Sequence, residues 1–283
     1  MADTALVLGA GGVTGTAWET GILHGLAKAG VDLSTADLIV GSSAGALVGA
    51  QLASGLVAVG DLYERQLADP EDDRRAAARP GPVTLLRYAR AVLSSRTPEE
   101  YGRRLGAAAR DSRTVATGAR RLAMIAGRLP SADWPERPLL VTAVDASTGR
   151  LHTFDRAGRV PLAEAVTASC AIPLVWPVVS AGGGTWIDGG VHSTANAHLA
   201  AGYERVVVIA PTATGTRVIA APRAQAADLE AAGARVEVIT PDAGSKKAVG
   251  HNSLDPARRA AAARAGLAQS AAHTEAVAAV WNG

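Results

Sequence analysis

Residues 4–15 read TALVLGAGGVTG, and residues 37–45 read DLIVGSSAG. Each stretch begins with a short apolar run and ends among glycines and other small residues, which is typical of a buried strand that enters a tight loop. After the first stretch, a helix is predicted over residues 16–30, where Trp18, Ile22 and Leu26 recur at helical spacing, and residues 46–54 have helical composition after the second stretch. The chain therefore begins with the order strand, helix, strand, helix.

The same alternation continues along the chain. Further strands are predicted at 138–146, 150–155, 185–188, 205–210 and 235–240. Further helices are predicted at 162–171, 195–202, 223–232 and 255–280. Strands that alternate with helices favour a mostly parallel sheet covered on both faces. We therefore expect one three-layer α/β/α domain over residues 1–283.

One segment departs from this pattern. Residues 56–136 have helical composition and no convincing strand, so we expect a helical insertion or cap there. Its 74–128 part holds thirteen arginines and no lysine against three acidic residues, in a chain whose net charge is +2. Two interpretations stay open, which are a solvated arginine-rich face and a basic amphipathic surface that docks on anionic lipid or an acidic partner.

Composition excludes several classes of protein. With 283 residues, 48% of them hydrophobic and 19% charged, the chain has enough apolar surface to fold rather than stay disordered. The only cysteine, Cys170, rules out an internal disulfide framework and makes a structural zinc site unexpected. No apolar run is long enough to span a bilayer, and the first residues lack a signal-peptide pattern, so a cytoplasmic location is expected. The small charge excess and 4% aromatic content argue against nucleic-acid binding.

The pentapeptide Gly41-Ser42-Ser43-Ala44-Gly45 has the form GxSxG between a predicted strand and a predicted helix. This is the setting of a nucleophile elbow, in which a sharp turn of small residues lifts a serine above the sheet at a helix N-terminus. An α/β-hydrolase triad fits poorly, because the elbow follows only the second strand and no histidine has a motif around it.

A different set of motifs fits better. The glycine-rich loop GAGGVTG (9–15), the GSSAG elbow and the turn Asp188-Gly189-Gly190 occur in an order and spacing that resembles the patatin-like phospholipase family. The resemblance extends to ASCAIPLVWP (168–177) and NSLDPARR (252–259), and so covers about two thirds of the chain. It implies that Ser43 is the nucleophile, Asp188 its base, and the amides of Gly11, Gly12 and Val13 the oxyanion hole, with no cofactor or metal.

The resemblance is not complete. Ala10 stands where the family commonly has glycine, and Thr14 where it commonly has arginine or lysine. Cys170 has no basic neighbour in sequence and is expected to be a small core residue. His192 and Asn196 follow the Asp-Gly-Gly turn closely and are candidates to line the site, although Asn196 also suits a helix N-terminus.

The expected function is hydrolysis of carboxylic esters of phospholipids or related acyl esters, with membrane-surface contact through the basic insertion. Three alternatives stay open. A lipid-binding relative would have lost turnover, and an acyltransferase would use the same residues with another acceptor. A dinucleotide-binding protein is disfavoured, because Gly9, Gly11 and Gly15 give GxGxxxG and no acidic residue ends the second strand. The oligomeric state cannot be read from the sequence.

Overall fold

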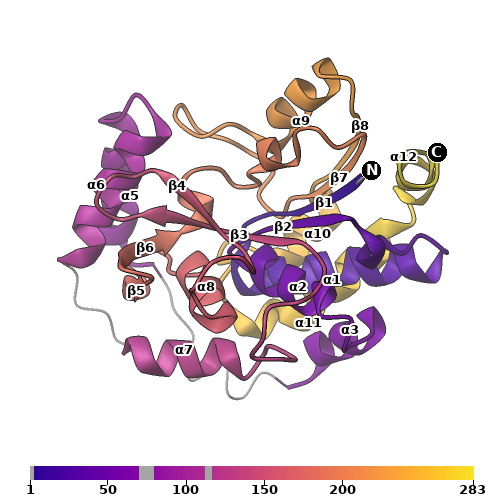
Figure 1. The fold of residues 1–283 in the computed structure, drawn as a ribbon, viewed down its shortest axis with the longest axis horizontal. Helices are drawn as coiled ribbons and strands as arrows, with labels where there is room; N and C mark the ends of the chain where they lie inside the picture. Colours follow the sequence, from indigo (N-terminus) through magenta and orange to yellow (C-terminus); the bar gives the residue numbers. More distant parts are fainter. Residues whose placement is uncertain (1–2, 70–79, 112–116) are drawn as a thin grey trace.

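An eight-stranded sheet runs through the centre of the protein (Figure 1). The computed structural model describes residues 3–69, 80–111 and 117–283. Seven strands follow the order β5-β6-β3-β2-β1-β7-β8, and β4 pairs with β3 beside this path. The strands are β1 Thr4–Leu8, β2 Leu38–Ser42, β3 Leu139–Asp145, β4 Leu151–Phe154, β5 Val179–Ala181, β6 Gly184–Asp188, β7 Arg205–Ile209 and β8 Arg235–Ile239.

The sheet is mostly parallel, as the alternating pattern predicts. Strands β3, β2, β1, β7 and β8 run parallel, whereas β4, β6 and β5 pair in antiparallel fashion at one end. Strand β5 was not predicted, because three residues give no readable alternation. Parallel strands bring their carboxyl ends to one edge of the sheet, so the loops after β1 and β2 open side by side.

Helices cover both faces, which confirms the three-layer α/β/α arrangement. Side chains of β1 alternate between them, since Leu6 and Leu8 pack on one face and Ala5 and Val7 on the other. The first face carries α1 Gly12–Lys28, α2 Ala44–Ala53, α8 Leu162–Ser169 and α11 Arg259–Ser270. The second carries α9 Pro222–Ala231 and the short 3-10 helix η3 Ala197–Ala200.

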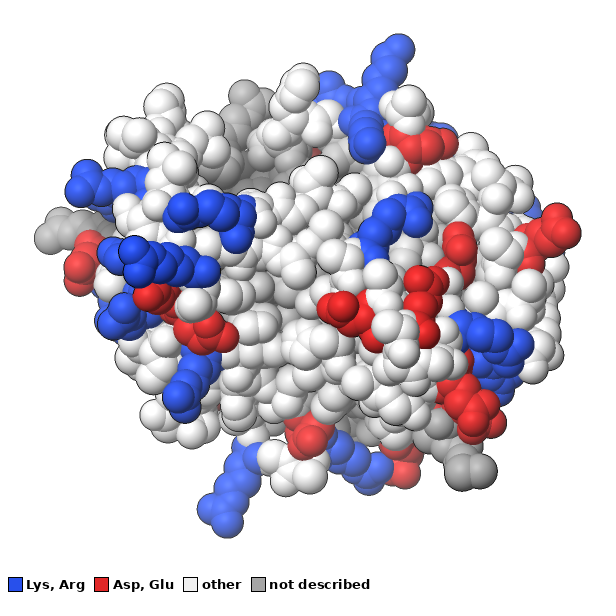
Figure 2. Space-filling view, turned by 90° about the horizontal axis from the view of Figure 1, so that it is seen from above, with Lys and Arg blue, Asp and Glu red and all other residues white. Residues whose placement is uncertain are grey.

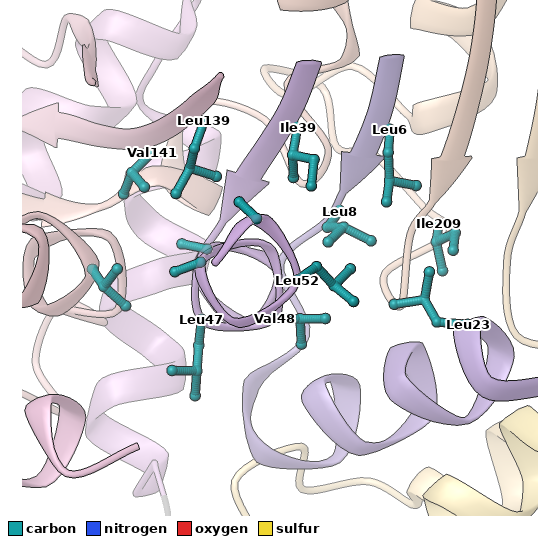
Figure 3. Packing of buried hydrophobic residues seen from close by; sticks show 14 of the residues in the cluster. Leu6, Leu8, Leu23, Ile39, Leu47, Val48, Leu52, Leu139, Val141 and Ile209 are labelled. Atoms are coloured by element: carbon teal, nitrogen blue, oxygen red, sulfur yellow. The ribbon is translucent and has the colours of Figure 1, made fainter. Parts of the chain in front are cut away.

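Helix α2 lies directly against the sheet (Figure 3). Its Leu47, Val48 and Leu52 are at most 4% exposed and belong to the same buried cluster as Leu8 and Ile39. Burial of side chains of this size stabilises the folded state by about 1.5–3 kcal/mol each. This packing fixes the N-terminus of α2 at the end of β2.

The predicted insertion is helical in its described part. It contains α3 Val59–Leu67, α5 Pro82–Leu93, α6 Pro98–Arg110 and α7 Gly118–Ala126. Helices α5 and α6 pack beside β3 and β6, and α7 lies against α8. The arginines at 74, 75, 79 and 113 lie outside the described residues.

Three predicted helices differ from the structure. The helix expected at 195–202 is only the 3-10 helix η3, and that expected at 255–280 is η4 Pro256–Arg258, α11 and α12 Thr274–Trp281. The last helix is interrupted because α11 packs on α1, whereas α12 covers β7 and β8. Helix α1 begins at Gly12, four residues before its predicted start, and α10 Ala243–Val249 was not predicted.

Candidate active site

Ser43 stands at a sharp turn between β2 and α2. Its backbone has φ 54° and ψ −112°, a conformation that costs a non-glycine residue about 1–3 kcal/mol and is concentrated at functional sites. A Cβ atom on Gly41 would lie 2.6 Å from Ala46 Cα, and one on Gly45 would lie 2.1 Å from Leu8 O. The two glycines of the motif are therefore required by close backbone approach, as the elbow interpretation predicts.

Ser43 and Asp188 meet across the edge of the sheet. The Ser43 hydroxyl donates a hydrogen bond of 2.7 Å to Asp188 Oδ2, although the two residues are 145 positions apart. Ser43 is 4% exposed and Asp188 5% exposed. The contact is therefore a buried hydroxyl–carboxylate pair, the arrangement in which a carboxylate takes the proton of an attacking alcohol.

The backbone around Asp188 holds this carboxylate in place. Asp188 ends β6, where it is opposite Ala143 of β3, and its amide donates to Ala171 O at 3.0 Å. Its second oxygen, Oδ1, accepts a 2.8 Å hydrogen bond from the amide of Gly190 in η2 Gly189–Val191. The Asp-Gly-Gly turn thus occupies one carboxylate oxygen and leaves the other directed at Ser43.

A buried polar network supports the elbow from below. The Asn196 side-chain amide donates to Ser42 Oγ at 2.8 Å and to Gly189 O at 3.2 Å, and Ser42 Oγ contacts Thr142 Oγ1 at 2.8 Å. Asn196 was a candidate to line the site or to begin a helix. It stands at the N-terminus of η3 without a side-chain cap hydrogen bond, and it is not among the residues that line the Ser43 pocket. It cross-links the β2, β3 and η2 ends, a role that its position in sequence does not reveal.

Burial changes the acidity of the pair. Desolvation raises the pKa of Asp188 to about 6, against opposing effects of the hydrogen bonds from Ser43 and Gly190 and of the positive charge of Arg121. Arg121 belongs to α7, and its guanidinium carbon lies 4.4 Å from the centre of the Trp176 ring. Sequence analysis did not single out Arg121, because only the tertiary fold brings α7 to Asp188.

Cys170 and Ser169 hold the Ser43 backbone. The Ser43 amide donates to Ser169 Oγ at 2.8 Å, and the Cys170 thiol donates to Ser43 O at 3.2 Å. Cys170 is buried, and desolvation raises its pKa to about 12. A thiol that stays protonated is a poor nucleophile, which agrees with the structural role expected for Cys170.

The glycine-rich loop lies beside Ser43. Gly12 and Val13 form the first turn of α1 and line the pocket over Ser43, whereas Gly11 is the residue before the helix and does not line it. First-turn amides have no acceptor within a helix. The Thr14 amide has an acceptor outside the helix, because it donates to Ser253 O at 3.0 Å.

The structure shows the surroundings of Thr14 and Ala10, the two residues of the glycine-rich loop that differ from the common family pattern, and of His192. Thr14 is fully buried, and its hydroxyl and amide both donate to Ser253 O, at 3.3 and 3.0 Å, so it anchors the loop without a charge. The methyl group of Ala10 lies close to Gly190. His192 is packed against His198 and is not among the residues that line the Ser43 pocket.

The pocket over Ser43 is narrow and mostly apolar. It contains about 50 Å³ of space for water-sized molecules, which is room for one or two waters in this conformation. Its walls include Met124 and Arg121 from α7 and the apolar side chains of Ile172 and Trp176. Among the residues that the structure describes, no three His, Cys, Asp or Glu side chains cluster in a way that could hold a metal ion.

Comparison with known proteins gives one match to a family. The model of the patatin-like phospholipase family matches residues 6–201. No curated protein matches the sequence significantly. Among solved structures, the fold is similar to VipD from Legionella pneumophila (14% identity, TM-score 0.48) and to the type III effector protein ExoU (16% identity, TM-score 0.39). These alignments cover 98% of this chain, but 67% of the VipD chain and 53%, about half, of the ExoU chain.

Proposed function

The chain belongs to the patatin-like phospholipase family and is a lipid hydrolase, and on this premise we propose that it cleaves carboxylic esters with Ser43 as nucleophile and Asp188 as base. The observation that carries the proposal is the 2.7 Å hydrogen bond between the buried Ser43 hydroxyl and Asp188 Oδ2. Family membership also decides against the dinucleotide-binding alternative.

The proposed reaction has two steps. Ser43 Oγ attacks the ester carbonyl carbon while its proton passes to Asp188 Oδ2, and Asp188 then gives this proton to the leaving alcohol, whose departure leaves an acyl-enzyme and an ionised Asp188. Water then attacks the acyl-enzyme, again with Asp188 as base, and releases the acid. The amides of Gly12 and Val13, with Gly11 completing the turn, stabilise the oxyanion of each tetrahedral intermediate.

The environment of Asp188 supports its proposed role as base. An ordinary aspartate accepts a proton weakly at neutral pH, and the desolvated site raises the pKa of Asp188 to about 6. At pH 7 the carboxylate remains mostly ionised, yet it is a stronger base than an exposed aspartate. No histidine is needed for the proton transfer.

The direct test measures hydrolysis of p-nitrophenyl esters of increasing chain length by wild type, Ser43→Ala and Asp188→Asn. Each substitution is expected to lower kcat/KM by about 10³-fold or more, because a nucleophile and its base act as a unit. Ser180→Ala, on the exposed part of β5, is the matched serine control and is expected to retain activity. Folded Ser43→Ala protein that hydrolyses the esters at the wild-type rate would contradict the proposal.

We also propose that α5 brings the protein to anionic membrane surfaces. Val83, Leu86 and Leu93 are 65–74% exposed and lie on one face of the helix, together with Arg87 and Arg90. Apolar side chains flanked by arginines are typical of helices that rest at the lipid interface. Figure 2 shows basic side chains gathered at the end of the molecule that carries α5 and α6 in Figure 1.

The proposed contact is peripheral. No helix within residues 3–69, 80–111 and 117–283 is long and apolar enough to cross a bilayer. Residues 80–111 contain six arginines and only three acidic residues, Glu99, Glu100 and Asp111. This part of the insertion therefore carries an excess of positive charge. The described structure therefore favours the basic-surface interpretation of the insertion over a merely solvated face.

A further inference from the structure

Helix α7 of the insertion forms one wall of the pocket over Ser43. Its Arg121, Met124 and Ile125 line this pocket, and their spacing of three residues and one residue places them on one side of the helix. The turn after α7 adds Arg128 to the same wall. The helix packs against α8, which keeps this side turned toward the site (Figure 1). The insertion therefore brings charged side chains to the proposed active site.

The guanidinium group of Arg121 is held over an aromatic ring. Its central carbon lies 4.4 Å from the centre of the Trp176 ring, and Trp176 is 8% exposed and lines the same pocket. Arginine stacks on indole by cation–π attraction, which strengthens where water is excluded. The pocket has about 50 Å³ of free space, so water screens the Arg121 charge little. The pocket over Ser43 thus contains a fixed positive charge.

The proposed reaction keeps one negative charge in this site at each stage. Asp188 carries the charge in the resting enzyme, and the oxyanion carries it once Asp188 has taken the Ser43 proton. A buried charge without compensation is costly. The glycine-rich loop GAGGVTG (9–15) contains no basic residue, so it offers amides but no positive charge. Arg121 supplies that charge from a different element of the fold.

The other ionisable groups near Asp188 are neutral at pH 7. Desolvation raises the pKa of Cys170 to about 12 and the pKa of Tyr88 well above its usual value, and the Asp188 charge acts in the same direction on both. Burial lowers the pKa of His192, which follows the Asp-Gly-Gly turn. Arg121, in contrast, is charged and favours the ionised form of Asp188.

We propose that Arg121 is a positioning residue that acts through Asp188, because its guanidinium group holds Asp188 as the carboxylate that accepts the Ser43 proton. This inference deepens the proposed function, on which it rests for the roles of Ser43 and Asp188. It gives the arginine-rich insertion a task inside the active site, in addition to membrane contact. Loss of the Arg121 charge would raise the pKa of Asp188 above about 6 and leave more of the base protonated at neutral pH.

The test is the pH profile of kcat/KM for p-nitrophenyl butyrate between pH 5 and pH 9, which reports ionisation of the free enzyme. Wild type is expected to lose activity below a midpoint near the Asp188 pKa of about 6. Arg121→Gln is expected to raise this midpoint by about 0.5–1 pH unit. Its kcat/KM is then about three- to tenfold below wild type at pH 5 and within about twofold of it at pH 9.

Three further variants locate the effect. Arg121→Lys keeps the positive charge and is expected to recover about half of the shift or more, although lysine lacks the planar group that stacks on Trp176. Arg121→Met keeps a long apolar side chain without the charge, so it is expected to shift the midpoint as Arg121→Gln does, and it replaces that variant should Arg121→Gln fail to fold. Arg120→Gln removes the same charge from an exposed position of α7 outside the pocket, and it is expected to keep the wild-type profile.

Direct titration of Asp188 separates this inference from the proposed function. Carbon NMR of isotopically labelled protein follows the Asp188 carboxyl group, whose signal is identified by its absence from Asp188→Asn. A raised midpoint in Arg121→Gln supports the role of Arg121 on Asp188, and if wild type hydrolyses no ester the same result stands while the Ser43 chemistry is refuted.

Two outcomes would overturn the inference and leave the Ser43 chemistry intact. One is an unchanged midpoint, in the rate profile and in the titration, for the uncharged variants at position 121. The other is a kcat/KM that falls by the same factor at every pH, because a uniform loss indicates that Arg121 only supports the shape of the pocket.

Discussion

At the scale of single residues, the Ser43–Asp188 pair shows how burial sets chemistry. Both side chains are almost fully covered, and the carboxylate keeps two hydrogen bonds, one from Ser43 and one from the Gly190 amide. These bonds favour the charged form, but desolvation is the larger effect and raises the pKa. Asp188 is therefore held in an environment that opposes its ionisation, and this opposition reduces the stability of the folded protein.

The stability cost of Asp188 has a defined pH dependence. The pKa is about 6 in the folded protein and near 3.8 in the unfolded chain, so between these values only the folded state holds the proton. Stability contributed by the protonated form is complete below pH 3.8 and is lost as pH rises toward 6. Asp188→Asn removes the charge, and we expect it to be more stable than wild type by about 1–3 kcal/mol at pH 8.

This prediction is checked by urea unfolding of both proteins between pH 5 and pH 8. The gap between Asp188→Asn and wild type is expected to narrow toward pH 5, because the wild-type carboxyl is then protonated in the folded state. A less stable variant at pH 8, or a gap independent of pH, would show that desolvation does not dominate at Asp188.

At the scale of elements, close packing of α1 on α11 supports the glycine-rich loop. A Cβ atom on Gly266 of α11 would lie 2.2 Å from Trp18 O, and one on Gly21 of α1 would lie 2.1 Å from Ala263 O. Glycines on both helices thus allow their backbones to approach. The same contact positions the first turn of α1, which carries Gly12 and Val13.

Gly266→Ala is expected to destabilise the protein by about 2 kcal/mol or more, because the added methyl group meets backbone that cannot move aside. Gly60→Ala in α3 is the matched control, since its Cβ would make only an ordinary 3.5 Å contact with His24. The control is expected to be unchanged or up to about 1 kcal/mol more stable, because alanine favours helix. Thermal or urea unfolding of both variants distinguishes a packing effect from a helix-propensity effect, and similar results for the two would refute the close-packing argument.

At the scale of the whole molecule, charge is unevenly distributed. The total net charge is +2, yet the described part of the insertion from residue 80 to 111 has a clear arginine excess. Helix α5 lies at the edge of the molecule, away from the helices on the first face of the sheet (Figure 1). Its exposed leucines and arginines give this end of the molecule a surface that is both apolar and positively charged.

Vesicle binding tests the membrane role of this surface. Leu86→Ser is expected to weaken partitioning to vesicles containing phosphatidylserine about fivefold, from loss of part of the apolar contact. Arg87→Gln/Arg90→Gln is expected to weaken it further and to reduce its sensitivity to salt. Leu56→Ser, at a leucine that is 66% exposed between α2 and α3, is the control and should bind as wild type does. Wild-type binding that is the same at low and high ionic strength would contradict the proposal.

Sequence patterns alone predict the alternation of strands and helices, the mostly parallel sheet and the three motifs near the site. These features depend on local apolar runs and on glycines at turns, both of which are readable over a few residues. The break between α11 and α12 could not be read, because helix composition continues through Ala271 and only packing against different elements separates them. The three-residue strand β5 carries too little pattern to be recognised.

The surroundings of Ser43, in contrast, depend on the tertiary fold. The Asn196 network, the approach of Arg121 to Asp188 and the pocket over Ser43 each join segments that lie far apart in the chain. Their contacts depend on how β2, β3, α2 and α7 are placed together, and no local pattern encodes those distances. The residue types of the site are thus written in the sequence, whereas their charges, burial and partners are properties of the folded molecule.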